Sequence, residues 1–89
     1  MVSTSDLKAI QEWAQRYGIR SVYLFGSSLL ESSEVSDIDL GIEGIPRERF
    51  FELTGKLDWA LSKSVDVVDL DSNNPFAPII RKYGRHIYG

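Results

Sequence analysis

Residues 21–42 read SVYLFGSSLLESSEVSDIDLGI, and this stretch decides the fold. It opens with a short run rich in β-branched and aromatic side chains, stopped by Gly26, which predicts a buried strand. It closes with Asp37–Ile42, where polar or small residues alternate with aliphatic ones, as in a strand with one covered face. Between the two strands, residues 27–36 are expected to hold a short helix followed by a loop.

The segments on either side of this stretch have helical or strand periodicity. Apolar residues recur at helical spacing over 5–17, where Ser5 can cap the helix start. A second helix is expected to begin at Pro46 and to carry an apolar stripe. Residues 64–70 resemble a third strand in composition and alternation. The predicted arrangement is therefore a small sheet covered by helices, of the α/β (α+β) class, and periodicity leaves open whether the sheet is parallel or mixed.

The tail of the chain is expected to form a last helix over 76–87, with Ile79, Ile80 and Tyr83 facing inward. Trp13 and Trp59 each lie in a predicted amphipathic helix. Packing in the core or at a subunit interface therefore explains them better than stacking on a nucleotide base.

Composition limits the chemistry that the protein can perform. The 89 residues are 43% hydrophobic and 26% charged, which predicts one globular domain over 1–89. There is no cysteine and one histidine, so oxygen ligands and Mg²⁺, Mn²⁺ or Ca²⁺ are favoured over zinc. A formal net charge of −3 argues against broad binding of duplex DNA. Without an apolar run of membrane-spanning length or a signal-like start, we expect a cytoplasmic protein.

The first candidate site feature is Gly26-Ser27, at the end of the first predicted strand. Glycine lets a phosphate approach the backbone closely, and the amides at a helix start attract an anion. The hydroxyl of Ser27 adds a donor. Taken alone, a strand followed by Gly-Ser is also an ordinary turn.

The second and third features are aspartates within predicted strands. Asp37 and Asp39 are two residues apart, so both carboxylates point to the same side and can converge on one Mg²⁺. Asp66 interrupts an apolar run and, on a neighbouring strand, would complete a cluster that binds metal or accepts a proton. Asp69 faces the opposite way on a regular strand, which favours a structural role. The alternative is that these aspartates lie at wet strand edges.

Together these motifs resemble a known family. Gly26-Ser27, nine intervening residues, Asp37-Ile38-Asp39-Leu40 and then Val65-Asp66-Val67 resemble the signature of the polymerase-β-like nucleotidyltransferase superfamily. The chain is similar in length to its smallest members, the minimal nucleotidyltransferases (MNT). The likeness runs from about Ile19 to the C-terminus, where residues 79–88 resemble the family's closing helix and its Gly-x-x-(aliphatic)-Tyr ending.

The resemblance implies a mixed sheet of three to four strands and a set of roles. Gly26 and Ser27 would hold the triphosphate of ATP. Asp37 and Asp39 would bind two Mg²⁺ ions, and Asp66 would activate the acceptor hydroxyl while touching one metal. The implied reaction is in-line attack on the α-phosphorus with pyrophosphate leaving, and clustered carboxylates suit such a two-metal site.

The resemblance also implies a partner. MNT proteins commonly pair with a HEPN-domain toxin and act as antitoxins that adenylylate a tyrosine of the HEPN ribonuclease. Two alternatives stay open, a non-catalytic antitoxin that neutralises its partner by contact and a small-molecule nucleotidyltransferase. Either a homodimer or a hetero-oligomer fits the sequence.

The chain departs from the family pattern just after Gly26-Ser27. Many relatives carry a small residue and an arginine there, whereas this chain has Ser28-Leu29-Leu30-Glu31. Four other cations could substitute for that arginine: Arg47, Arg81, Lys82 and Arg85.

Overall fold

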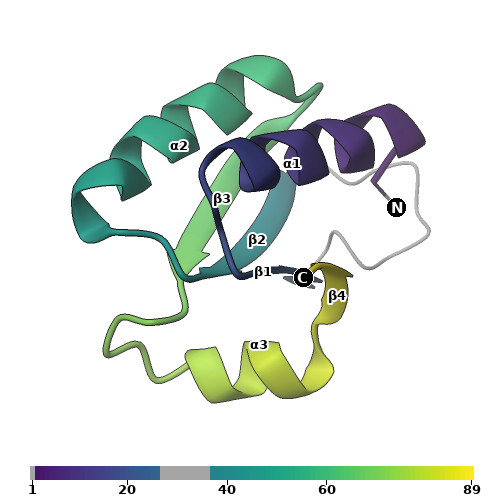
Figure 1. Ribbon diagram of the computed structural model, residues 1–89. Helices are drawn as coiled ribbons and strands as arrows, with labels where there is room; N and C mark the ends of the chain where they lie inside the picture. The colour runs from purple at the N-terminus through teal and green to yellow at the C-terminus, as the bar shows by residue number, and fades with distance from the viewer. Residues whose placement is uncertain (1, 27–36) are drawn as a thin grey trace.

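The computed structural model describes residues 2–26 and 37–89, so the short helix expected over 27–36 lies outside the described residues. The described elements are α1 (Thr4–Arg16), β1 (Ser21–Phe25), β2 (Asp37–Glu43), α2 (Arg47–Ala60), β3 (Ser64–Asp69), α3 (Ala77–Tyr83) and β4 (Arg85–Tyr88) (Figure 1). None of the described helices is long and apolar enough to cross a membrane.

The strands form one mixed sheet in the order β3-β2-β1-β4. β1 is antiparallel to both β2 and β4, whereas β2 and β3 are parallel and are joined through α2. The α/β (α+β) class with a mixed sheet, implied by the family resemblance, is confirmed. Because of these directions, the end of β1 lies beside the starts of β2 and β3, at one end of the sheet.

The alternation predicted for Asp37–Ile42 separates the two faces of β2. Its aliphatic residues Ile38, Leu40 and Ile42 are buried in the main core. That core lies between the sheet and the helices α1 and α2, which cover one side, whereas α3 covers the other (Figure 1). Asp37, Asp39 and Gly41 alternate with the aliphatic residues, so their side of β2 is the side that α3 packs against.

α3 covers only part of its side of the sheet. It buries Ala77 and Ile80 in a second, smaller core with Leu70. A Cβ at Gly41 would lie 2.9 Å from Ile80 Cγ2 and 3.1 Å from Leu70 Cδ1, so the bare glycine lets α3 approach the sheet closely. Asp39, two residues earlier on the same face, remains half-buried beyond the region that α3 covers.

The predicted last helix over 76–87 is wrong in its C-terminal part. The helix ends at Tyr83, and Gly84 has extended backbone with ψ 157°. The following residues, Arg85–Tyr88, pair with β1 as β4. This pairing gives hydrogen-bond partners to the backbone N–H and C=O groups along the second edge of β1, which residues in a helix could not do.

Two details of the helices also differ from the sequence-based expectation. Ile79 and Tyr83 are exposed, not inward-facing, because a short helix on a flat sheet buries one narrow stripe, here Ala77 and Ile80. The N-cap of α1 is Ser3 rather than Ser5.

The start of α1 is tied to the end of α2 through a buried carboxylate. Ser3 Oγ accepts a hydrogen bond from the Asp6 backbone N–H at 3.2 Å, which makes Ser3 the cap. The Asp6 side chain in turn accepts bonds from the backbone N–H and the hydroxyl of Ser62. These bonds join two helices that both cover the main core.

Candidate active site

The three predicted aspartates lie on one face of the sheet, at one end. Asp39 of β2 is directly opposite Asp66 of β3 in the parallel register. Neighbouring strands lie about 4.8 Å apart, and directly opposite residues project to the same side. Asp37 is two residues before Asp39 and therefore shares that side. The sheet thus brings together Asp39 and Asp66, which are 27 residues apart in the chain.

These carboxylates differ in exposure. Asp37 and Asp39 on the inner strand β2 are half-buried. Asp66 is exposed on the edge strand β3. It therefore faces water, which is the alternative that the sequence left open. A carboxylate at this position is accessible to another molecule from the side of the sheet.

The carboxylate oxygens of these aspartates are ligands of the kind that Mg²⁺ prefers. Within the described part of the chain, no three carboxylate or imidazole groups come close enough to form a complete metal cage. Mg²⁺ does not require one, because it binds through one or two carboxylates together with substrate phosphate oxygens and water. Asp39 and Asp66, with Asp37 beside them, supply that number of carboxylates on an open face.

Gly26 lies against the carboxylate of Asp39. It follows β1 with φ 64°, a conformation that side chains other than glycine rarely adopt. A Cβ at this position would lie 2.5 Å from Asp39 Oδ2 and 3.3 Å from Asp39 Cγ. The glycine therefore leaves bare backbone beside the carboxylate, where a phosphate group can approach. Ser27 lies outside the described residues, and its role in triphosphate binding stays a prediction.

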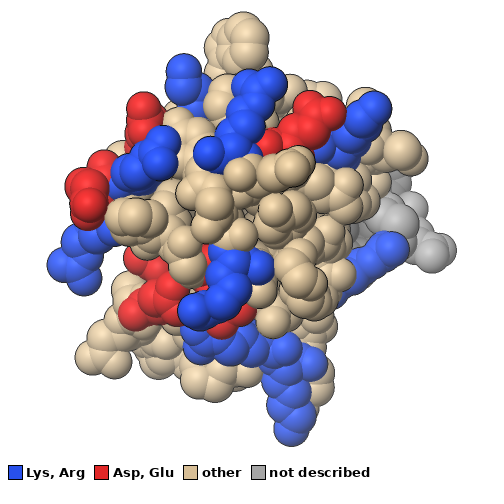
Figure 2. Space-filling model, in the orientation of Figure 1, with Lys and Arg blue, Asp and Glu red and all other residues tan. Residues whose placement is uncertain are grey.

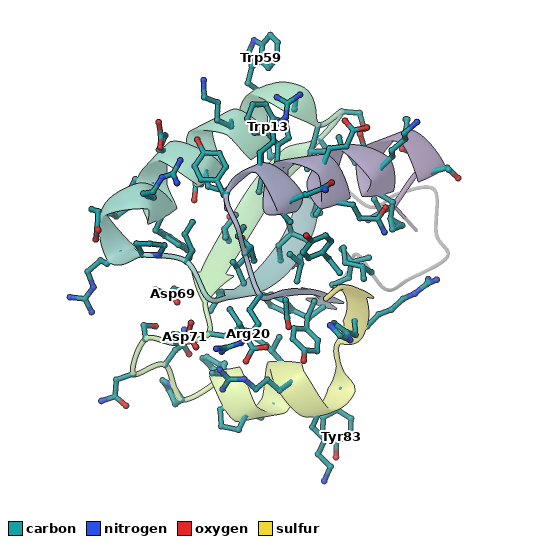
Figure 3. The ribbon with its side chains drawn as sticks, viewed as in Figure 1. Trp13, Arg20, Trp59, Asp69, Asp71 and Tyr83 are labelled. Atoms are coloured by element: carbon teal, nitrogen blue, oxygen red, sulfur yellow. The ribbon has the colours of Figure 1, made fainter. Side chains whose placement is uncertain are left out.

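Asp69 has the structural role expected from its position. Its Oδ1 accepts a hydrogen bond from the Asp71 backbone N–H at 3.0 Å, in the turn that follows β3. Figure 3 shows Asp69 and Asp71 together in this loop, with Arg20 beside them. Asp69 is therefore held in the turn and does not join Asp66.

Arg81 cannot replace the arginine that the family pattern places after Gly-Ser. Its Nε donates to Glu43 Oε2 at 2.8 Å and its Nη2 donates to the Leu70 carbonyl at 2.9 Å. Glu43 ends β2, whereas Asp37 begins it, so Arg81 lies at the opposite end of the sheet from the carboxylates. Arg47 begins α2 and belongs to that far end as well.

Arg85 lies at the end of the sheet that carries the candidate site. It pairs with Leu24 of β1, whose side chain lies in the main core, so Arg85 projects to the side of the sheet that α1 covers, opposite to the face of Asp39. On the face drawn in Figure 2, acidic and basic side chains lie beside one another, and no broad basic surface covers that face.

The ion pairs of Arg81 hold α3 against the sheet, and their loss is expected to lower stability. The Arg81→Met variant should reduce the free energy of unfolding by about 1–2 kcal/mol, since charge-assisted hydrogen bonds contribute this much when partly exposed. Urea denaturation followed by circular dichroism measures the change. The Lys82→Met variant, on the same helix, is the control and should change stability by less than about 0.5 kcal/mol. Equal midpoints for the two variants would contradict the role of Arg81.

The single histidine, His86, and the two tryptophans have packing or surface positions. The ring of His86 stacks on Tyr23, with ring centroids 4.8 Å apart. Trp13 packs against the main core, as predicted, whereas Trp59 is 84% exposed.

The sequence did not predict the close approach of α3 to the sheet over Gly41. One small residue in an alternating strand carries no local signal of what packs on it.

The sequence matches the family described as "Polymerase beta, Nucleotidyltransferase" over residues 8–89. The comparison with curated proteins gives no match. Among solved structures, a toxin–antitoxin with AMP-PNP is 28% identical, with a TM-score of 0.76 over 93% of this chain and 73% of that chain.

Two further solved structures show the same likeness. The toxin–antitoxin MntA-HepT is 25% identical, with a TM-score of 0.74 over 98% of this chain and 73% of that chain. The complex of a tri-AMPylated Shewanella oneidensis HEPN toxin with its MNT antitoxin is 26% identical, with a TM-score of 0.72 over 94% and 70%. The predicted resemblance to MNT proteins is confirmed, and the chain belongs to the polymerase beta nucleotidyltransferase family.

Proposed function

We propose that this chain transfers AMP from ATP to a tyrosine hydroxyl of a HEPN-domain partner and thereby acts as its antitoxin. The single observation that carries the proposal is the pair Asp39 and Asp66, directly opposite each other beside the bare backbone of Gly26. The family match supports nucleotidyl transfer. The similarity to an antitoxin in complex with an AMPylated HEPN toxin supports the choice of acceptor.

Each residue has a defined part in this proposal. The backbone at Gly26 and the hydroxyl of Ser27 hold the triphosphate. Asp37, Asp39 and Asp66 would hold two Mg²⁺ ions, which would neutralise charge on the phosphate oxygens. Asp66 accepts the proton of the acceptor hydroxyl. That oxygen then bonds to the α-phosphorus of ATP as the bond to pyrophosphate breaks.

The position of Asp66 favours a protein acceptor. Its carboxylate is exposed on the edge strand β3, so the acceptor side chain can reach it from outside the sheet. A tyrosine at the surface of another protein is long enough to place its hydroxyl there while the protein stays outside.

The second candidate function is an antitoxin that acts by contact without transfer. The observation that favours it is the apolar stripe on the outer face of α3, where Phe76, Ile79 and Tyr83 are 64%, 54% and 69% exposed. Figure 3 shows Tyr83 projecting away from the body of the molecule. Such a surface suits binding of a protein whether or not AMP is transferred.

Mass spectrometry separates the two functions. The HEPN partner is incubated with this chain, ATP and Mg²⁺, and its peptides are searched for AMP on tyrosine, which we expect to find. The matched control replaces ATP by its α,β-methylene analogue, which cannot release pyrophosphate and should give no adduct. An unmodified partner whose ribonuclease is nevertheless silenced in a stable complex would reject AMP transfer in favour of contact.

A further inference from the structure

Helix α2 carries apolar side chains on two of its faces. Leu53 and Leu57 are buried in the main core. Phe51 and Trp59 are 80% and 84% exposed on the outer side. A surface helix normally has one apolar stripe, facing its own core, and a second stripe indicates a second packing partner.

Gly55 lies at the centre of the outer stripe. Glycine is among the least favourable residues in a helix interior and usually has a packing reason there. Gly26 and Gly41 have such reasons, because a Cβ at either would collide with a neighbour. At Gly55, apart from its chain neighbours and the backbone of its own helix, no described atom lies within 4 Å of the Cβ position. The space that this glycine leaves is therefore open to another molecule.

The outer stripe borders a hollow between α1 and α2. The hollow has a volume of about 480 Å³ and is lined by Trp13, Phe51, Glu52, Gly55, Lys56 and Trp59. Figure 3 shows Trp13 between the two helices and Trp59 pointing away from the molecule at the far end of α2. Exposed aromatic side chains around a depression, with charges at the edge, have the composition of a protein interface.

We propose that this surface binds a second copy of the chain, with the two α2 helices packed antiparallel and crossing at Gly55. The residues are arranged symmetrically about that crossing point, because Phe51 and Trp59 each lie four positions from Gly55. A two-fold axis through the crossing therefore places Phe51 of one copy opposite Trp59 of the other. The absent Cβ of Gly55 lets the helix backbones approach closely.

The charges of the outer face are complementary in the same arrangement. Glu52 precedes the crossing point by three residues and Lys56 follows it by one. In an antiparallel pair, Glu52 of one copy is then displaced along the helix axis from Lys56 of the other by about two residues, or roughly 3 Å. The two-fold axis creates this opposite-charge pair twice, and it brings the two Lys56 side chains to the same displacement once, so attractive pairs outnumber the repulsive one. The Glu52 side chain is 55% exposed and lies 3.7 Å from Arg49 of its own helix, so it remains accessible to the second copy.

The aromatic side chains supply a large part of the contact area that a weak, reversible dimer needs. Two exposed aromatic side chains from each copy would bury roughly 600–1,000 Å², at about 150–250 Å² for each ring-bearing side chain. This is about half of the roughly 1,200–2,000 Å² of a stable protein interface. The backbone contact at Gly55 and the charged edge add to it.

Sedimentation-velocity ultracentrifugation of the wild type and the Gly55→Gln variant, from micromolar to submillimolar concentration, tests the proposal. The wild type should dimerise reversibly. The variant should raise the dissociation constant at least tenfold, while its Tm stays the same or rises because a better helix former replaces glycine in open space. Lys8→Gln, an exposed substitution on α1, is the control and should dimerise as the wild type does. A wild type that is monomeric throughout, or a Gly55→Gln variant that dimerises equally well, would overturn the proposal.

A charge exchange tests the antiparallel geometry. Glu52→Lys should weaken dimerisation several-fold, because it turns both opposite-charge pairs between the copies into pairs of lysines. The double variant with Glu52→Lys and Lys56→Glu restores both opposite-charge pairs and should return the dissociation constant toward that of the wild type. A double variant as weak as the single one would reject the antiparallel contact.

Discussion

The Asp39→Asn variant is expected to lower the rate of AMP transfer by roughly 10²–10⁴-fold while leaving the fold intact. The amide has the same size as the carboxylate, so it preserves the contact of Asp39 with Gly26. It removes one of the two negative charges that lie opposite each other on β2 and β3. The measurement is kcat/KM for the HEPN partner at saturating ATP and Mg²⁺, with far-UV circular dichroism to verify folding.

The matched comparisons are two further Asp→Asn variants. Asp66→Asn should lose transfer to a similar extent, because this carboxylate is proposed to accept the proton of the hydroxyl. Asp58→Asn, on the exposed side of α2, should transfer AMP at the wild-type rate. If Asp39→Asn retained a rate within about fivefold of Asp58→Asn, the assignment of the candidate site to Asp39 would be rejected.

Gly26→Ala is the second change for which we expect a large effect. The new Cβ would lie 2.5 Å from Asp39 Oδ2, so either the carboxylate or the end of β1 must move. The positive φ of 64° adds a backbone strain of about 1–2 kcal/mol. We therefore expect reduced stability in urea denaturation and a loss of AMP transfer of at least roughly 10²-fold, since small displacements of catalytic groups have effects of this size.

Gly18→Ala is a control with the same backbone strain. Gly18 also has φ 64°, but no described atom lies within 4 Å of a Cβ there. This variant should lose a similar free energy of unfolding and keep the wild-type rate of transfer per folded molecule. The difference between the two variants isolates the contact between Gly26 and Asp39. Equal transfer rates in both would mean that this contact does not matter for the reaction.

Local periodicity was enough to predict most of the helices and strands. The alternation over Asp37–Ile42 predicted β2 and its two faces, because side chains two residues apart on a strand share a side whatever surrounds them. The composition of their runs, rich in β-branched or aromatic side chains, predicted β1 and β3. The strand end at Gly26 and the turn-bound Asp69 also followed from local chemistry.

The sequence by itself therefore determined the main secondary structure, the oxygen ligands of the candidate site and the common face of Asp37 and Asp39. Only the tertiary structure decided that Asp66 is directly opposite Asp39 in the register of β2 and β3, that Arg81 pairs with Glu43 at the other end of the sheet, and that the tail forms β4. Each of these depends on a hydrogen-bonded or packed partner distant in the chain. Register and edge pairing are set by such partners, and no periodicity within a segment encodes them.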